Sequence, residues 1–220
     1  MGFDDATYRP CACCQAVWYQ RIHALWRARG KTKCDALIAQ RKRIYFESLQ
    51  GNVLEIGPGT GPNLSYYPSD IQWIGIEPNQ YMHPYLKQAA AQHKIQAQIH
   101  CATAEQLPNA DASVDAVVST MALCTVTRLA DTFNEILRVL KPGGRFIFIE
   151  HVAAPNGTAL RRIQNMAQPL WHVVYAGCYP NRELWTAIER AGFADVHLEH
   201  FRLPILVESP HIAGVAIKHG

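Results

Sequence analysis

The feature that most constrains this chain is an apolar run, Val53 to Ile56, that leads into three closely spaced glycines, Gly57, Gly59 and Gly61. A short continuous apolar run before a turn signal predicts a buried strand. Glycines directly after a strand let the backbone turn tightly and let a ligand approach more closely than side chains would permit. Such ligands are usually nucleotide-like cofactors. A glycine loop alone is a weak signal, so its meaning depends on the residues at fixed distances downstream of it.

A second constraint is Glu77, which ends the next apolar run, Ile71 to Ile76, at 77 − 57 = 20 positions after Gly57. A carboxylate at this place can accept both ribose hydroxyls of a cofactor whose tail lies on the glycine loop. An acidic residue at a strand end is often only solvated, but its distance from the loop favours the ribose contact. A dinucleotide loop would read Gly-x-Gly-x-x-Gly, and here the third glycine comes one position early, which disfavours NAD.

Strand-like and helical segments alternate along the chain, which predicts an α/β fold with a mostly parallel sheet covered on both faces. Ligands of such sheets lie beyond the carboxyl ends of the strands, near the switch point. Further strands are expected at about 95–101, 114–119, 145–150, 195–200 and 213–218. Helices are expected at about 12–50 with a break at Gly30, at 62–67, from Pro84, around 133–140 and at 181–191, and the stretch 151–179 reads as irregular and aromatic.

The length of 220 residues suits one domain with an amino-terminal extension, so we expect a helical extension over residues 1–50 and the main domain over 51–220. A net charge of +3 is too mild for a nucleic-acid partner. No apolar run is long enough for an integral membrane segment or a signal peptide, which predicts a cytoplasmic location. The aromatic, basic first helix either lies on a membrane surface, closes over a substrate or packs on the edge of the domain.

The seven cysteines are an odd number without the spacing of a disulfide framework, so reduced thiols are expected. Cys11, Cys13 and Cys14, with Cys34 further on, contain no repeated Cys-x-x-Cys pair at a finger-like distance. We therefore expect ordinary reduced cysteines there and no metal.

The pattern Glu55-x-Gly57-x-Gly59-x-Gly61 resembles motif I of the class I S-adenosylmethionine-dependent methyltransferases. This resemblance implies a Rossmann-like fold with a seven-stranded, mostly parallel sheet and S-adenosylmethionine as cofactor. It extends over about residues 51 to 151, because the turn Leu140 to Gly144 also resembles the family's turn before strand five.

The same resemblance implies further cofactor contacts. Ala102 to Pro108 resembles the loop that meets the adenine, and Asp115 to Thr120 resembles the strand that borders the methyl group. Many members carry Asp where this chain has Thr103. The cofactor-binding residues expected in addition to motif I and Glu77 are Pro78, Thr103, Ala104, Glu105, Ser119 and Thr120.

A narrower resemblance, from about Arg41 to Lys218, is to the methyltransferase-like 7 family of alkyl thiol methyltransferases. Its segments are Leu123 to Val126, Glu150 to Ala154, Pro169 to His172, Gly177-Cys178, Arg182 to Trp185 and Pro210 to Gly214. This resemblance implies methyl transfer to the sulfur of a small lipophilic thiol. Animal members carry an amino-terminal membrane anchor, and no such anchor is expected in this chain.

Transfer to a thiol requires the thiolate, so a nearby imidazole could act as base. His151, directly after the fifth strand, is the first candidate and His172, in the aromatic insertion at about 151–180, is the second. Either could instead be a structural histidine. Cys124, just after the fourth strand, could contact substrate or be a small buried residue.

Two other functions stay open at this point. Motif I and the Pro-Gly-Gly turn do not distinguish acceptors, so one alternative is an N-methyltransferase of a small amine or a phospholipid headgroup. The other is a protein that binds S-adenosylmethionine without turnover.

Overall fold

The computed structural model describes residues 16–29, 33–204, 207 and 209–220, apart from the side chains of Lys33 and Cys34. Cys11, Cys13 and Cys14 lie outside the described residues, as does the Cys34 side chain. The expectation of ordinary thiols at these positions therefore stays a prediction.

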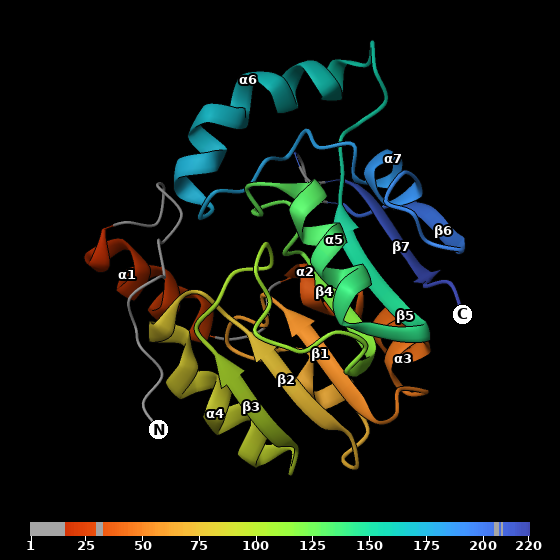
Figure 1. Cartoon of the computed structure of the whole chain (residues 1–220). Helices are drawn as coiled ribbons and strands as arrows, with labels where there is room; N and C mark the ends of the chain where they lie inside the picture. The colour runs from red at the N-terminus through yellow and green to blue at the C-terminus, as the bar shows by residue number, and fades with distance from the viewer. Residues whose placement is uncertain (1–15, 30–32, 205–206, 208) are drawn as a thin grey trace.

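Seven strands form one sheet in the order β3-β2-β1-β4-β5-β7-β6 (Figure 1). β1 to β5 pair in parallel, whereas β7 runs antiparallel to both β5 and β6. The predicted seven-stranded, mostly parallel sheet is confirmed. The strands are β1 Asn52–Ile56, β2 Gln72–Ile76, β3 Gln96–His100, β4 Val114–Thr120, β5 Leu140–His151, β6 Asp195–Arg202 and β7 Pro210–Ile217.

The strand order reverses at β1, which pairs with β2 on one side and β4 on the other. In the register, Leu54 faces Ile74 of β2 and Val117 of β4. All three strands end at the same edge of the sheet, because they are parallel. The switch point therefore lies where the glycine loop begins, which is where open α/β sheets bind their ligands.

Two apolar cores cover the two faces of the sheet, since successive side chains of a strand point to opposite faces. On one face, Leu54 belongs to the core that includes Phe133 and Leu184. On the other face, Val53 belongs to the core that includes Phe46 and Leu86. Figure 1 shows α5 in front of β4 and β5 and α3 behind them.

The helices are α1 Val17–Ala28, α2 Lys33–Leu37, α3 Ala39–Phe46, α4 His83–Gln92, α5 Leu129–Val139, α6 Ala159–Val174 and α7 Leu184–Glu189, with 3-10 turns η2 Leu64–Tyr66 and η3 Gln80–Met82.

The largest difference from the sequence prediction is α6, a helix of 16 residues in a stretch expected to be irregular. That prediction was wrong because Pro169, a residue that normally breaks helices, lies inside this one. The helix also exposes its apolar face: Met166 and Leu170 are 82% and 69% exposed, and the buried residue is the polar Gln164. A smaller difference is that the helical stretch expected between Gly30 and residue 50 is interrupted at Ile38 and forms α2 and α3.

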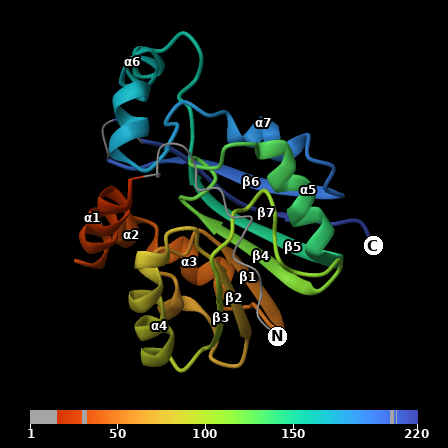
Figure 2. The same ribbon diagram turned by 60° about the vertical axis from the view of Figure 1, so that its left-hand side comes forward.

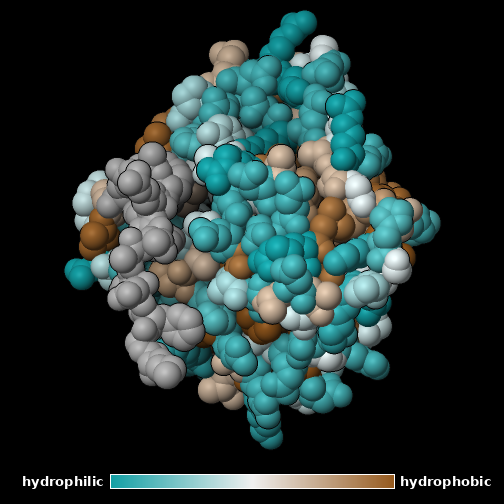
Figure 3. All heavy atoms as spheres, viewed as in Figure 1, coloured by the Kyte–Doolittle hydropathy of each residue, from teal (hydrophilic) through white to brown (hydrophobic). Residues whose placement is uncertain are grey.

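α1 and the end of α6 lie next to each other beyond the carboxyl ends of the strands (Figures 1 and 2). The Tyr19 hydroxyl joins them, because it donates to the Val174 carbonyl at 3.0 Å and accepts from the Ala176 N–H at 3.0 Å. The outer face of α1 carries exposed Trp18 and Ile22, and Figure 3 shows hydrophobic side chains at this edge. Within the described residues, no helix is both long and apolar enough to cross a membrane.

Candidate active site

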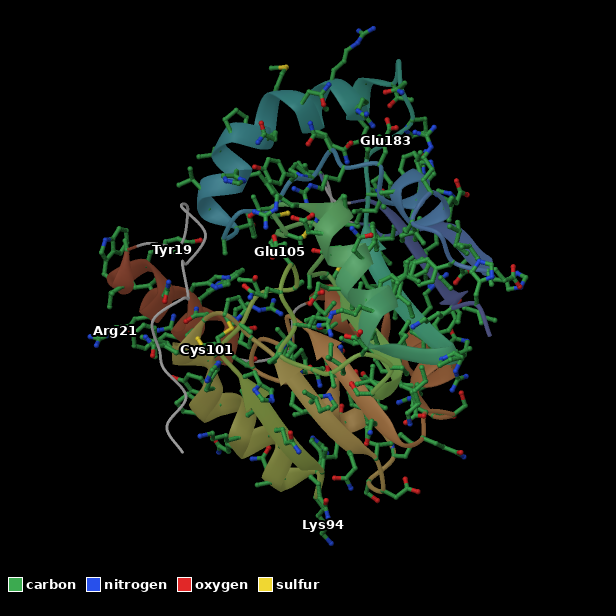
Figure 4. All side chains as sticks on the ribbon, in the orientation of Figure 1. Tyr19, Arg21, Lys94, Cys101, Glu105 and Glu183 are labelled. Atoms are coloured by element: carbon green, nitrogen blue, oxygen red, sulfur yellow. The ribbon has the colours of Figure 1, made fainter. Side chains whose placement is uncertain are left out.

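A cavity of about 1360 Å³ opens at the carboxyl ends of the central strands. Its walls come from α1, from the loops after β1, β2 and β3, from the end of β4 and from the segment that follows α6. Figure 4 labels three lining residues, Tyr19 on α1 and Cys101 and Glu105 in the loop after β3. Typical ligand pockets measure roughly 300–1,000 Å³. This cavity is therefore large enough for a cofactor together with a second molecule.

The glycine loop forms one wall, and its first two glycines line the cavity. Gly57 has a φ of +62°, in the left-handed region, and its N–H donates to the Ile76 carbonyl at 2.9 Å. A side chain at this position would bring its Cβ to 2.7 Å from the Ala122 Cβ, closer than atoms can pack. Glycine is therefore required here by both the backbone conformation and the space. Gly61 lies outside the lining, and a Cβ there would meet Leu64 at 2.7 Å.

Glu77 follows β2 and is only 6% exposed. One of its carboxylate oxygens accepts from the Gly59 N–H at 2.9 Å and the other from the Asn79 N–H at 2.8 Å. Burial raises the pKa of Glu77 to about 7, and these two hydrogen bonds oppose the rise. The glycine loop and this carboxylate are thus held together at one end of the cavity, as the distance in the sequence predicts. A buried acceptor of this kind suits the two hydroxyls of a ribose.

Glu55, the acidic residue of the glycine motif, is buried at the end of β1 and also lines the cavity. Its carboxylate accepts from Asn63 at 2.7 Å, from the Tyr67 hydroxyl at 2.9 Å and from the Trp73 indole at 3.1 Å. Burial raises the pKa of this carboxyl, and the three hydrogen bonds act in the opposite direction. The Asn63 amide also donates to the Thr120 hydroxyl at 3.1 Å. Glu55 therefore fixes the glycine loop against β2 and β4.

The loops after β2, β3 and β4 bring most of the other predicted cofactor residues to the same cavity. Pro78, Thr103, Ala104, Glu105 and Thr120 all line it. The Glu105 carboxylate accepts from the Thr127 N–H at 2.8 Å, which fixes the chain that leads into α5.

Ser119, by contrast, lies outside the lining and is fully buried. Its hydroxyl donates to Glu150 at 2.6 Å, and the same carboxylate oxygen accepts from the Ala122 N–H at 3.1 Å. Burial raises the pKa of Glu150. Ser119 and Glu150 therefore shape the turn after β4 from beneath the cavity.

In another part of the cavity wall, the structure brings together Cys124, His151 and Cys178. All three are buried, and Nε2 of His151 lies 3.1 Å from Sγ of Cys178. His151 and Cys124, two of the three residues predicted to be catalytic, therefore line the cavity, and their catalytic roles stay predictions. His172 does not line the cavity, and its ring instead packs against Tyr179 with the ring centres 4.5 Å apart.

Several lining residues were not predicted as site residues. Tyr19, His23 and Trp26 on α1 line the cavity. Whether this helix closes over a ligand stays a prediction. Burial, followed by the Arg27 charge, lowers the pKa of His23 to about 4, so its imidazole is neutral at physiological pH. The only sequence signal for Cys178 was its place in one of the segments shared with alkyl thiol methyltransferases.

Known proteins similar to this chain agree with the geometry. A sequence family described as a methyltransferase domain matches residues 54–148. The human thiol S-methyltransferase TMT1A is 37% identical over 194 residues, which cover 82% of this chain and 80% of the relative. The rat thiol S-methyltransferase TMT1B is 35% identical over 211 residues, which cover 92% and 86%.

Solved structures agree on the fold. A SAM-dependent methyltransferase from Thermotoga maritima superposes with a TM-score of 0.65 at 20% identity, covering 92% of this chain and 98% of that one. The resemblance to alkyl thiol methyltransferases that was inferred from sequence motifs is confirmed by the two relatives. This chain is therefore a methyltransferase that uses S-adenosylmethionine, and it belongs to the family of the thiol S-methyltransferases TMT1A and TMT1B.

Proposed function

We propose that this enzyme transfers a methyl group from S-adenosylmethionine to the sulfur of a small lipophilic thiol. The observation that carries the proposal is the continuity of one cavity from the Glu77 carboxylate to the Cys124 and His151 side chains. One part of its wall offers a nucleoside the Glu77 carboxylate and close approach to the glycine loop. Another part offers a sulfur and an imidazole. Thiol methylation by the relatives TMT1A and TMT1B supports the same acceptor.

The residues in the first part of the wall fit the cofactor. Gly57 and Gly59 allow close approach of its tail, Glu77 accepts from its ribose, and Thr103 to Glu105 border its adenine. We propose that Glu55 and Ser119 do not contact the cofactor but support the residues that do, since their hydrogen bonds hold the loops that form this surface. The sulfonium of the cofactor makes its methyl electrophilic, so the protein's main task is to align the acceptor and exclude water.

The residues around the acceptor support a lipophilic molecule. Trp26, Met121, Val126 and Tyr175 contribute apolar surface to the wall. A thiol becomes a good nucleophile only after it loses its proton. His151 is the imidazole beside the two cysteines, so it is the group proposed to take part in this step. His172 is assigned a structural role because its ring packs on Tyr179.

We further propose that the helical extension, residues 1–50, acts as a lid over the domain formed by 51–220, and that the insertion at about 151–180 completes the acceptor pocket. The contribution of α1 to the cavity wall supports the lid. The exposed apolar side chains of α1 and α6 also suit peripheral contact with a membrane from which a lipophilic thiol would enter. A cytoplasmic location stays a prediction from the sequence.

The test is formation of S-adenosylhomocysteine by the purified full-length chain with a panel of alkyl thiols and a matched panel of amines in which NH₂ replaces SH. Turnover confined to the thiols is the expected result. Turnover confined to the amines would establish an N-methyltransferase. Cofactor binding without product from either panel would leave a binding protein.

A further inference from the structure

We propose that Cys124, His151 and Cys178 bind a zinc ion, with a fourth coordination position open to the cavity for the sulfur of the acceptor. The inference deepens the proposed function, because it says how the acceptor thiol is activated. The sequence predicted no metal, since these three residues lie far apart in the chain and form no spacing motif. The fold brings them together.

The geometry is close to that of a zinc site. The two sulfurs and the imidazole nitrogen all lie within 4.8 Å of one another, and all three residues are buried. Ligand atoms of a tetrahedral zinc with these donors are separated by about 3.6–3.8 Å, from metal distances of roughly 2.1 Å to nitrogen and 2.3 Å to sulfur. Nε2 of His151 and Sγ of Cys178, at 3.1 Å, lie slightly closer than that. Small rotations of the three side chains therefore suffice.

The backbone holds the three ligands on separate supports. His151 is the last residue of β5, where it pairs in the register with His211 of β7. The Tyr179 N–H donates to the Cys124 carbonyl at 2.9 Å, so the segment that carries Cys178 is fixed to the segment that carries Cys124. A site whose ligands come from the sheet and from two loops fixed to each other is formed before the metal binds.

The donor set indicates a catalytic rather than a structural zinc. Structural sites use four protein ligands, whereas catalytic sites use three and leave one position for water or substrate. Two cysteines and one histidine form such a catalytic set, and here the three donors line a cavity with space for an acceptor. A coordinated thiol is deprotonated outright, which removes the need for a free base.

The charge balance also fits. Zinc with two thiolates and a neutral imidazole is uncharged, and an acceptor thiolate brings the cluster to −1. The Arg182 guanidinium, whose charge acts on both Cys124 and Cys178, offsets this excess. It donates to the Leu123 carbonyl at 2.9 Å and lies 4.3 Å from the centre of the Tyr179 ring, so it is held beside the cluster.

The step balances without an oxidant or reductant. The acceptor thiol loses its proton to solvent as its sulfur joins the metal. Its sulfur then attacks the methyl carbon of the sulfonium, a new carbon–sulfur bond forms, and the bond between that carbon and the cofactor sulfur breaks. The products are a methyl thioether, which is a weak metal ligand and leaves, and S-adenosylhomocysteine. His151 therefore takes part in the deprotonation of the thiol as a zinc ligand, and not as a free base.

The first experiment measures metal on the full-length protein, purified under a phosphine reductant so that no disulfide forms. Zinc is quantified by mass spectrometry, and the metal-free protein is titrated with Co²⁺, whose absorption reports tetrahedral geometry and thiolate ligands. One equivalent is expected in the natural protein and in the control Cys101→Ser, a cavity cysteine outside the cluster. Cys124→Ser, Cys178→Ser and His151→Gln are expected to lose the ion or to give an altered cobalt spectrum, with weaker thiolate absorption in the two cysteine variants, while calorimetry shows unchanged binding of S-adenosylhomocysteine.

Retention of the full cobalt spectrum in Cys124→Ser and Cys178→Ser would overturn the inference. The same holds for an ion that disappears only when Cys11, Cys13 and Cys14 are replaced, since it would then belong to the amino-terminal cysteines. Addition of an alkyl thiol, but not the matching alcohol, is expected to shift the cobalt absorption. A spectrum that does not respond to the thiol would remove the acceptor from the metal.

Kinetics then separate this inference from the proposed function. A thiol with a pKa of about 8.5, the value of free cysteine, is roughly 3% thiolate at pH 7, so coordination raises the thiolate fraction about 30-fold, and by more for an alkyl thiol of higher pKa. Removal of zinc is expected to lower kcat/KM by about that factor at pH 7 and to restore a steep rise with pH, and added zinc reverses both. Full thiol methylation by metal-free enzyme would refute the zinc site and leave the function intact. A cobalt spectrum with tetrahedral geometry and thiolate ligands, without methylation of any thiol, would support the metal site and refute the proposed function.

Discussion

Replacing Glu77 by Gln tests whether a buried carboxylate with a raised pKa binds the ribose. The pKa of Glu77 is about 7 in the folded protein against an ordinary value of 4.5. A difference of this size corresponds to about 3 kcal/mol, at 1.36 kcal/mol per pKa unit. Because the folded state holds the proton more tightly than the unfolded state, the contribution is fully present below pH 4.5 and is lost as the pH rises through 7.

The free energy of unfolding of the cofactor-free protein should therefore fall by about 3 kcal/mol more between pH 4.5 and pH 8 in the natural protein than in Glu77→Gln. The exposed Glu189 provides the matched control, and Glu189→Gln should follow the natural protein. Urea unfolding at several pH values gives the comparison, and the difference between variants cancels the other titrating groups. Identical slopes for Glu77→Gln and the natural protein would refute the reasoning.

Cofactor binding should show the opposite dependence, since the ribose hydroxyls need the ionised carboxylate as acceptor. With a pKa of about 7, the dissociation constant for S-adenosylhomocysteine should rise about tenfold from pH 8 to pH 6. Glu77→Gln should bind weakly at both values, because an amide offers one acceptor oxygen where Gly59 and Asn79 already supply two N–H donors. Calorimetry with equal affinity of the natural protein at both pH values would show that Glu77 does not bind the ribose in its ionised form.

Three further substitutions separate cavity residues from their supports. Gly57→Ala should reduce cofactor affinity at least about tenfold and lower the melting temperature, because its Cβ would collide with Ala122 at a positive φ; normal affinity by calorimetry would contradict the close approach. Ser119→Ala should cost about 1–3 kcal/mol in urea unfolding, since it removes a buried hydrogen bond, yet leave the cofactor affinity within about twofold. His172→Gln should leave kcat/KM for thiols nearly unchanged, because its ring contacts Tyr179 outside the cavity; a fall in kcat/KM of about tenfold or more would return His172 to the reaction.

The half of the fold that binds the cofactor could be predicted because its constraints are local. The Val53 to Ile56 run, the left-handed Gly57 and the strand that ends at Glu77 each leave a pattern of a few residues. The parallel sheet then follows from the alternation of strands and helices. Contacts at Gly61 and Ser119 were assigned to the cofactor because a motif does not show which of its members face a ligand and which pack behind it.

The acceptor end could not be predicted in the same way. The sequence pattern did not predict α6 as a helix, because its apolar residues are exposed and Pro169 lies within it. The meeting of Cys124 with Cys178 depends on a backbone hydrogen bond between segments that are distant in the sequence. Tyr19 and His23 reach the cavity from a helix whose own pattern indicates only an amphipathic surface. Tertiary contacts decide these positions.

The Tyr19 hydroxyl, which joins α1 to the turn after α6, bears on which step limits the rate of turnover. The wall of the cavity proposed for cofactor and product includes both segments, so we expect exchange of these molecules to require that the two hydrogen bonds break. Opening of such a closure, rather than chemistry, often limits the rate of an enzyme. Rapid mixing should then show a burst of thioether in the first turnover, followed by a slower steady state. Tyr19→Phe, which lacks the hydroxyl, should raise the steady-state rate.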